Sequence, residues 1–124
     1  MKPIETNNAP AAVGPYSQSI LTGDILFLSG QVPLCPKSGE IIGSNATEQT
    51  QQVMKNLAAV LEAAGGSFKN VVKMGIFLKD LSDFGAVNEV YASHLQKPYP
   101  ARACVEVARL PKDVLVEIEA IARI

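Results

Sequence analysis

Two charged residues near the end of the chain, Arg102 and Glu117, have the types that a small hydrolytic site needs. Arg102 lies in the largely apolar segment PARACVEV, where an arginine normally has a fixed anionic partner or ligand. Its planar fork of N–H donors binds a carboxylate in bidentate fashion. An internal ion pair with Glu106 or Glu117 explains the same pattern. A bound carboxylate ligand and a salt bridge therefore both remain open.

Glu117 could hold and polarise a water molecule through its carboxylate. We expect residues 101–109 and 114–123 to be neighbouring strands, and their antiparallel pairing would bring Arg102 and Glu117 within a few residues of register. Glu119 shares a face with Glu117, so period-two alternation does not choose between the two carboxylates. A salt bridge or a solvated charge is the alternative role.

Four other positions could contribute to a site. Cys104 is a candidate nucleophile, but no histidine is near it in the sequence, and a buried cysteine most often behaves as a small apolar side chain. Tyr16 could place its hydroxyl at a pocket rim, or be a half-buried strand aromatic. Ser29-Gly30 could present backbone to a ligand, or form a simple turn. We expect His94 on a helix surface, without a catalytic role.

The elements that must position these residues are short and are separated by Pro/Gly clusters. The order is strand, strand, helix, strand, helix, strand, strand. The first two strands form a hairpin around Thr22-Gly23-Asp24, and Leu110–Asp113 makes the last turn. The predicted strands are 16–21, 25–30, 70–79, 101–109 and 114–123, and the predicted helices are 46–64 and 81–95.

Both helices have end signals and an apolar stripe. Asn45 and Glu48 have the spacing of a capping box, and Gly65-Gly66 ends the first helix. Ser82 or Asp83 can cap the second. The stripes consist of Val53, Leu57, Val60, Leu61 and Ala64 in the first helix, and Phe84, Val87, Tyr91 and Leu95 in the second.

The last predicted strand indicates an uncovered surface. Val116, Ile118, Ala120 and Ala122 share one face, while the other face mixes apolar side chains with carboxylates. Elements with buried stripes must pack in layers, which favours a single α+β domain over residues 1–124 with two helices on one face of a mixed sheet. Nothing in the chain is left to cover the opposite face, so we expect an oligomer.

Composition excludes several classes of function. The 124 residues include 48% hydrophobic residues and carry a net charge of -1, without a Lys/Arg run that would indicate nucleic-acid binding. The segment MKPIETNNAP is not a signal peptide, and no stretch approaches the ~18 apolar residues of a membrane helix. With two cysteines, which we expect to be free thiols, and one histidine, a metal site is not expected. We expect a cytoplasmic protein without metal or organic cofactor.

Longer motifs resemble the Rid (YjgF-type) family, and specifically its RidA subgroup. The most specific is PARACVEVARLPKDVLVEIEAIA at residues 100–122. Four further segments support it, and the resemblance covers essentially the whole chain. These segments are NAPAAVGPYSQS (8–19), LSGQVP (28–33), LEAAGGSFKNVVK (61–73) and FLKDLSDFGAVNEVY (77–91).

The resemblance implies a fold, an assembly and a reaction. The fold is chorismate-mutase-like α+β, and the assembly is a homotrimer with a central barrel-like core and sites between subunits. The activity is hydrolysis of reactive 2-imino or enamine acids, such as 2-iminopropanoate and 2-iminobutanoate, to 2-keto acids and ammonia. A ribonuclease or translation inhibitor, and a non-catalytic regulator that binds a keto acid, are the alternatives.

The resemblance also assigns residues. It implies that Arg102 grips the substrate carboxylate and that Glu117, in preference to Glu119, positions the water. It places Cys104 in the pocket mainly through its backbone. The segment 93–99, between the second predicted helix and Pro100, is short compared with members of that family. Its length should alter the pocket rim, so the resemblance does not assign a preference among imino acids. The other pocket positions that it implies are Tyr16, Ser29, Gly30 and Asn88.

Overall fold

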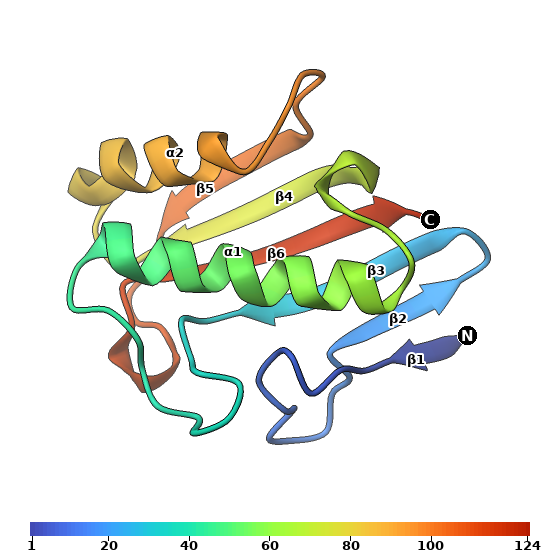
Figure 1. Cartoon of the computed structure of the whole chain (residues 1–124). Coiled ribbons are helices and arrows are strands. Elements are labelled where there is room, and N and C mark those ends of the chain that lie inside the picture. The colour runs from blue at the N-terminus through green and yellow to red at the C-terminus, as the bar shows by residue number, and fades with distance from the viewer.

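The computed structural model describes all 124 residues and shows two helices covering one face of a six-stranded mixed sheet (Figure 1). This α+β architecture confirms the prediction. Three single turns of 3-10 helix, η1 to η3, lie between the main elements. In chain order the elements are β1 (Lys2–Ile4), β2 (Ser19–Thr22), β3 (Ile25–Gln31), α1 (Ala46–Ala63), η1 (Phe68–Asn70), β4 (Val71–Leu78), η2 (Leu81–Asp83), α2 (Phe84–Ser93), β5 (Ala101–Glu106), η3 (Pro111–Asp113) and β6 (Val116–Arg123).

The strand order is β1-β2-β3-β6-β4-β5, and β4 with β5 is the parallel pair. The predicted antiparallel pairing of the last two strands is therefore wrong, because β4 lies between them. The reason is the α2 crossover, which returns the chain to the end of the sheet where β4 began, so that β5 runs parallel to β4. Arg102 pairs with Met74 and Glu117 pairs with Phe77, on opposite edges of β4.

The predicted residues cap both ends of α1, but one of the predicted hydrogen bonds differs. The Asn45 side chain accepts a 2.9 Å hydrogen bond from the backbone N–H of Glu48. The Glu48 carboxylate accepts a 2.9 Å hydrogen bond from the backbone N–H of Ser44 and none from that of Asn45. The second hydrogen bond of the expected capping box is therefore not formed. At the other end Gly65 has a φ of +84° and, with Gly66, donates back to the last turn of the helix.

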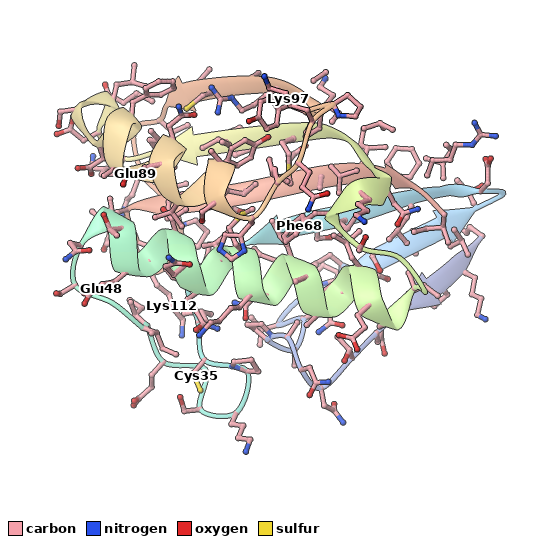
Figure 2. All side chains as sticks on the ribbon, turned by 45° about the horizontal axis from the view of Figure 1, so that its top comes forward. Cys35, Glu48, Phe68, Glu89, Lys97 and Lys112 are labelled. Carbon is pink, nitrogen blue, oxygen red and sulfur yellow. The ribbon has the colours of Figure 1, made fainter.

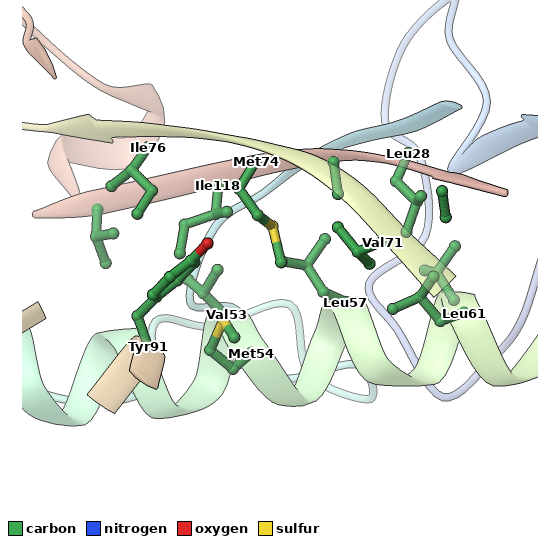
Figure 3. Packing of buried hydrophobic residues seen from close by; sticks show 14 of the residues in the cluster. Leu28, Val53, Met54, Leu57, Leu61, Val71, Met74, Ile76, Tyr91 and Ile118 are labelled. Atoms are coloured by element: carbon green, nitrogen blue, oxygen red, sulfur yellow. The ribbon is translucent and has the colours of Figure 1, made fainter. Parts of the chain in front are cut away.

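The hydrophobic core lies between the helices and the sheet (Figure 3). It contains 19 buried residues, among them the predicted α1 stripe apart from the partly buried Ala64. The predicted alternation of β6 is confirmed, because its even-numbered residues face the helices and are buried. Those four residues are Val116, Ile118, Ala120 and Ala122.

Two features of the local structure differ from what the sequence pattern predicted. β1 was not expected, because three residues that include Pro3 give little strand signal, yet it pairs with β2 as an edge strand. Asp80 accepts from the N–H of Ser82 and caps η2, whereas Asp83 occupies the predicted N-cap position of α2 but makes no capping hydrogen bond, and α2 begins only at Phe84. His94 is half-buried at the end of α2, where Nε2 lies 2.9 Å from Oε1 of Gln51.

The face of the sheet that points away from the helices has no cover within the chain (Figure 1). Ile20 pairs with Phe27, and Phe27 pairs with Ile121, which places an apolar row across three strands of this face. Phe27 is 48% exposed and Val105, on β5, is 45% exposed. An apolar surface of this kind on a small protein typically contacts another chain. Neither helix is both long and apolar enough to cross a membrane.

Candidate active site

The Arg102 guanidinium is held by α2. It lies over the rings of Phe84 and Tyr91, with its central carbon 5.5 Å and 5.1 Å from their centroids, and Nη1 donates to Oδ1 of Asn88. Phe84, Asn88 and Tyr91 are spaced i, i+4, i+7 and therefore share one face of the helix. Cation–π contacts and a hydrogen bond to a neutral amide position the guanidinium without neutralising its charge. We call these four residues the arginine half-site.

Arg102 has no carboxylate partner within the chain, so of the two alternatives that the sequence left open the internal ion pair is not formed. The two ion pairs of the chain join Arg109 to Asp113 and Arg123 to Asp24. Glu106, one of the expected partners, instead accepts from the N–H of Leu81 at 3.0 Å. The pocket beside the guanidinium has a volume of about 430 Å³. It is lined by Asn88, Tyr91, Ala92, Tyr99, Pro100 and Arg102.

Glu117 lies on the other face of the sheet. It lines a 490 Å³ pocket together with Tyr16, Ser29 and Gly30, and we call these four residues the glutamate half-site. The carboxylate packs against Gly30, where a Cβ atom would lie 3.0 Å from Cδ of Glu117 and closer still to Oε1. Burial, and then the charge of Glu119, raises the pKa of Glu117 above its ordinary value. A carboxylate with a raised pKa is a better acceptor for a proton from water.

Glu119 is in a different environment. It is exposed and lies over Gly75 on β4, where a Cβ atom would be 3.0 Å from its Cγ. The Glu117 pocket does not include it. Glu119 instead lines a neighbouring pocket that also reaches Ser29 and Gly30, so of the two carboxylates on this face of β6 only Glu117 shares a pocket with Tyr16.

The chain does not bring the two half-sites together. Arg102 faces α2, whereas Glu117 faces away from the helices, and β4 lies between their strands. They also line separate pockets. A site that uses both residues on one ligand therefore requires a second copy of the chain.

Cys104 is a poor candidate for a nucleophile. Its side chain is half-buried and packs against the core, and both cysteines are free thiols. Burial raises the pKa of the Cys104 thiol, and the nearby charge of Arg102 only partly opposes that effect. The reactive thiolate is therefore disfavoured.

The remaining titratable groups form no second catalytic cluster. No group of three His, Cys, Asp or Glu side chains is arranged to hold a metal ion. The pKa of His94 is lowered, first by burial and then by the charge of Lys55. Its ring also packs edge-on to Phe68, 6.0 Å between centroids, which indicates a structural role.

The sequence pattern did not indicate that two side chains of α2 support Arg102. Phe84 and Tyr91 were read only as an apolar stripe directed at the core, whereas both rings also contact the guanidinium. Lys112 was likewise placed only in a turn, and it lines the pocket of Glu117. The i, i+4, i+7 spacing of Phe84, Asn88 and Tyr91 was the signal that could have revealed the first group.

The fold and these half-sites define a small α+β protein with an unneutralised arginine and a half-buried carboxylate, each beside a pocket. The sequence profile described as Endoribonuclease L-PSP matches residues 6–124. The chain therefore belongs to this family, which is the Rid (YjgF-type) family that its motifs resemble.

Named relatives are similar over nearly the whole chain. The mouse (Mus musculus) 2-iminobutanoate/2-iminopropanoate deaminase is 49% identical over 121 residues, which are 98% of this chain and 90% of that protein. The crystal structure of RidA from the Antarctic bacterium Psychrobacter has a TM-score of 0.96, 48% identity and complete coverage of both chains. The structure of Escherichia coli TdcF with bound serine has a TM-score of 0.93 and 48% identity, covering 100% of this chain and 99% of that one.

Proposed function

We propose that this protein hydrolyses small 2-imino acids, such as 2-iminopropanoate and 2-iminobutanoate, to 2-keto acids and ammonia. The observation that carries the proposal is the unpaired charge of Arg102 beside an open pocket. A guanidinium fixed by Phe84, Tyr91 and Asn88 is ready to bind a carboxylate in bidentate fashion. The relative with bound serine supports a ligand of this size and charge.

Glu117 is the proposed general base. Once the imine nitrogen is protonated, the adjacent carbon is electrophilic, and the oxygen of a water held by Glu117 adds to it while the water proton passes to the carboxylate. That proton then passes from Glu117 to the nitrogen of the tetrahedral intermediate. As the C–N bond breaks and ammonia leaves, the hydroxyl group gives its proton to the Glu117 carboxylate and becomes the carbonyl of the keto acid, and Glu117 releases the proton to the departing ammonia. The raised pKa of Glu117 suits these transfers. No step needs a metal or an organic cofactor.

The proposed active unit is a homotrimer in which each site combines the arginine half-site of one chain with the glutamate half-site of the next. The separation of the two half-sites on one chain supports this arrangement. The apolar row of Ile20, Phe27 and Ile121 offers a surface for the contact between chains. Tyr16, Ser29, Gly30 and the backbone at Cys104 would complete the substrate pocket.

A mixing experiment tests both the chemistry and the assembly. Arg102→Ala and Glu117→Gln chains are each expected to be inactive as pure proteins. When they are unfolded together and refolded at equal concentrations, about a quarter of wild-type activity should return, because one site in four receives both intact residues. No recovery would mean that one chain supplies both residues, and a folded wild-type protein that does not accelerate keto-acid release would refute the reaction itself.

Endoribonuclease activity is the second candidate, because the family description carries that name. The net charge of -1 and the lack of basic clustering argue against an RNA substrate. RNA cleavage by the purified protein that is lost in Arg102→Ala would support this activity at the same site. Saturable binding of a keto acid without imine turnover would instead support a regulatory role.

A further inference from the structure

We infer that Gln49, a residue of α1, is a positioning residue that fixes the carboxylate of Glu117 by holding the backbone of Leu115, two residues before it. The Oε1 atom of Gln49 accepts a 2.8 Å hydrogen bond from the N–H of Leu115. Gln49 is 6% exposed and does not line the pocket of Glu117, so it acts on a ligand only through the backbone. The inference rests on the proposed function and names a residue outside the site on which the placement of the general base depends.

The pairing of β6 is the first argument. On one side Glu117 pairs with Phe77 of β4. On the other side the last pair with β3 joins Ile118 to Gln31, so this ladder stops one residue short of Glu117. Backbone groups that strand pairing leaves free must find other partners. On the β3 side, the position of the β6 end that carries Glu117 is therefore set by groups outside the sheet.

The turn before β6 is the second argument. Lys112 and Asp113 have φ angles of +55° and +56°, in the left-handed region that favours glycine. A turn with such strain keeps its shape only where neighbouring groups hold it. Lys112 donates to the carbonyl oxygen of Gly39 at 3.0 Å, and Figure 2 shows it beside the loop between β3 and α1. Leu115 lies between this turn and Glu117, so loss of its bond to α1 allows the turn to relax and to shift the start of β6.

A polar stripe on the buried side of α1 is the third argument. The Nε2 atom of Gln49 donates to the carbonyl oxygen of Gly43 at 3.2 Å, which holds the amide in the orientation that presents Oε1 to Leu115. Asn56, 1% exposed, donates to the carbonyl oxygens of Val32 and Leu34 at 3.1 and 3.0 Å, in the pocket wall that follows β3. A buried amide costs stability unless it is hydrogen-bonded, and an apolar side chain would serve packing alone. These amides therefore take the place of strand pairing where β3 and β6 part.

The two half-sites should respond differently to the loss of this contact. Arg102 is held by side chains of α2, which the hydrogen bonds of Gln49 do not reach, so binding of the substrate carboxylate should not change. A general base that is displaced by about 1 Å can lose about 100-fold in rate. The inference therefore predicts a loss of kcat at nearly constant KM.

Three variants of buried α1 residues test the inference. Gln49→Met removes both side-chain hydrogen bonds and keeps an unbranched side chain of similar length. Gln49→Glu retains an oxygen that accepts from Leu115 and loses the N–H donor to Gly43. Gln52→Met is the matched control, because Gln52 is 8% exposed on the same helix and donates at 2.9 Å to Asn56, without a hydrogen bond to β6. If Gln49→Met does not fold, Gln49→Asn replaces it, since its amide is one methylene too short to reach Leu115.

The first readout is steady-state kinetics with an imino acid generated in situ. Gln49→Met should lower kcat about 10- to 100-fold at nearly unchanged KM, Gln49→Glu should recover most of that loss, and Gln52→Met should keep the wild-type kcat. Equal losses of kcat in Gln49→Met and Gln52→Met would show a general effect of a buried amide on the fold and would overturn the inference. A rise of KM at constant kcat in Gln49→Met would overturn it as well.

The pKa of Glu117, measured by NMR titration of its side-chain carboxyl carbon, is a readout that does not need turnover. Burial raises this pKa in the folded chain. A freed start of β6 should hydrate the carboxylate and lower the pKa towards its ordinary value in Gln49→Met but not in Gln52→Met. An unchanged pKa in Gln49→Met would contradict the positioning role. Absent turnover in wild type would instead refute the proposed function, and the pKa comparison would then decide by itself whether Gln49 positions Glu117.

Discussion

The arginine half-site and the glutamate half-site are built from the same sheet in different ways. The arginine half-site comes from one contiguous β4–α2–β5 unit, and its guanidinium is held by side chains from a single helix. The glutamate half-site joins Tyr16 near the start of the chain, Gly30 at the end of β3 and Glu117 on β6. Its residues meet only because β6 pairs between β3 and β4.

This contrast indicates in which half-site a substitution can remove activity without lowering the stability of the fold. The first half-site is exposed at an edge strand and depends on local contacts, so its chemistry can be removed while the fold remains intact. The second is tied to central strands and to loops anchored on α1, so structural damage there affects both stability and catalysis. The following variants test that difference.

Arg102→Ala should have the largest effect on activity. We expect kcat/KM to fall roughly 10³-fold, because the substrate loses its orienting charge, while the free energy of unfolding changes by less than about 0.5 kcal/mol. The small stability effect follows from the absence of an ion pair at Arg102. Arg102→Lys should recover little activity, since an ammonium lacks the bidentate fork. Unchanged kinetics in Arg102→Ala would contradict the proposed site.

Gly30→Ala should damage the glutamate half-site without removing a functional group. The new Cβ would collide with the Glu117 carboxylate, and the flexible end of that side chain must move aside. A misplacement of about 1 Å can lower kcat/KM by about 100-fold. Gly75→Ala is the matched control, because its Cβ displaces Glu119 instead. Equal losses in the two variants would show that the position of Glu117 is not what matters.

Two asparagine variants compare the supports of the half-sites. Asn56→Ala should lower the free energy of unfolding by about 2–3 kcal/mol, because it leaves two carbonyl groups behind the pocket wall without their donor. Asn88→Ala removes one bond to the exposed Arg102 and should cost less than about 1 kcal/mol. Urea unfolding measures both. A larger loss for Asn88→Ala would reverse the comparison.

Glu117→Gln, which should be inactive, is expected to change stability only slightly, and the change should be a gain. The raised pKa means that folded Glu117 binds its proton more tightly than the unfolded residue does, so protonation stabilises the fold and stability falls as the pH rises through the raised pKa. At neutral pH the amide removes this penalty and the Tm should increase by a few degrees at most. The gain should vanish below the ordinary glutamate pKa of about 4.3. Thermal melts against pH measure the gain. Glu119→Gln should give a smaller gain, because the charge of Glu119 is the lesser of the two causes that raise the pKa of Glu117. A lower Tm for Glu117→Gln at pH 7 would contradict the raised pKa.

Sequence periodicity predicted the helices and the faces of β6 because their signals are local. The apolar stripe of α1 and the alternation from Val116 to Ala122 report burial directly. β1 escaped prediction because its three residues pair only at an edge, and the pairing of β5 escaped because chain order favoured a hairpin. Asn88 was indicated only by the family resemblance, since no local pattern distinguishes it from other polar helix residues.

The sequence by itself determined the α+β class, the buried stripes and the two residue types, arginine and glutamate, that suit a small organic anion. Side-chain spacing and backbone propensity act over a few residues, so such features can be read from the chain. Only the tertiary structure decided that Arg102 is free of an ion pair, that Glu117 is half-buried against Gly30, and that the two face opposite sides of the sheet. These properties depend on strand order, which is set by packing between segments distant in the sequence.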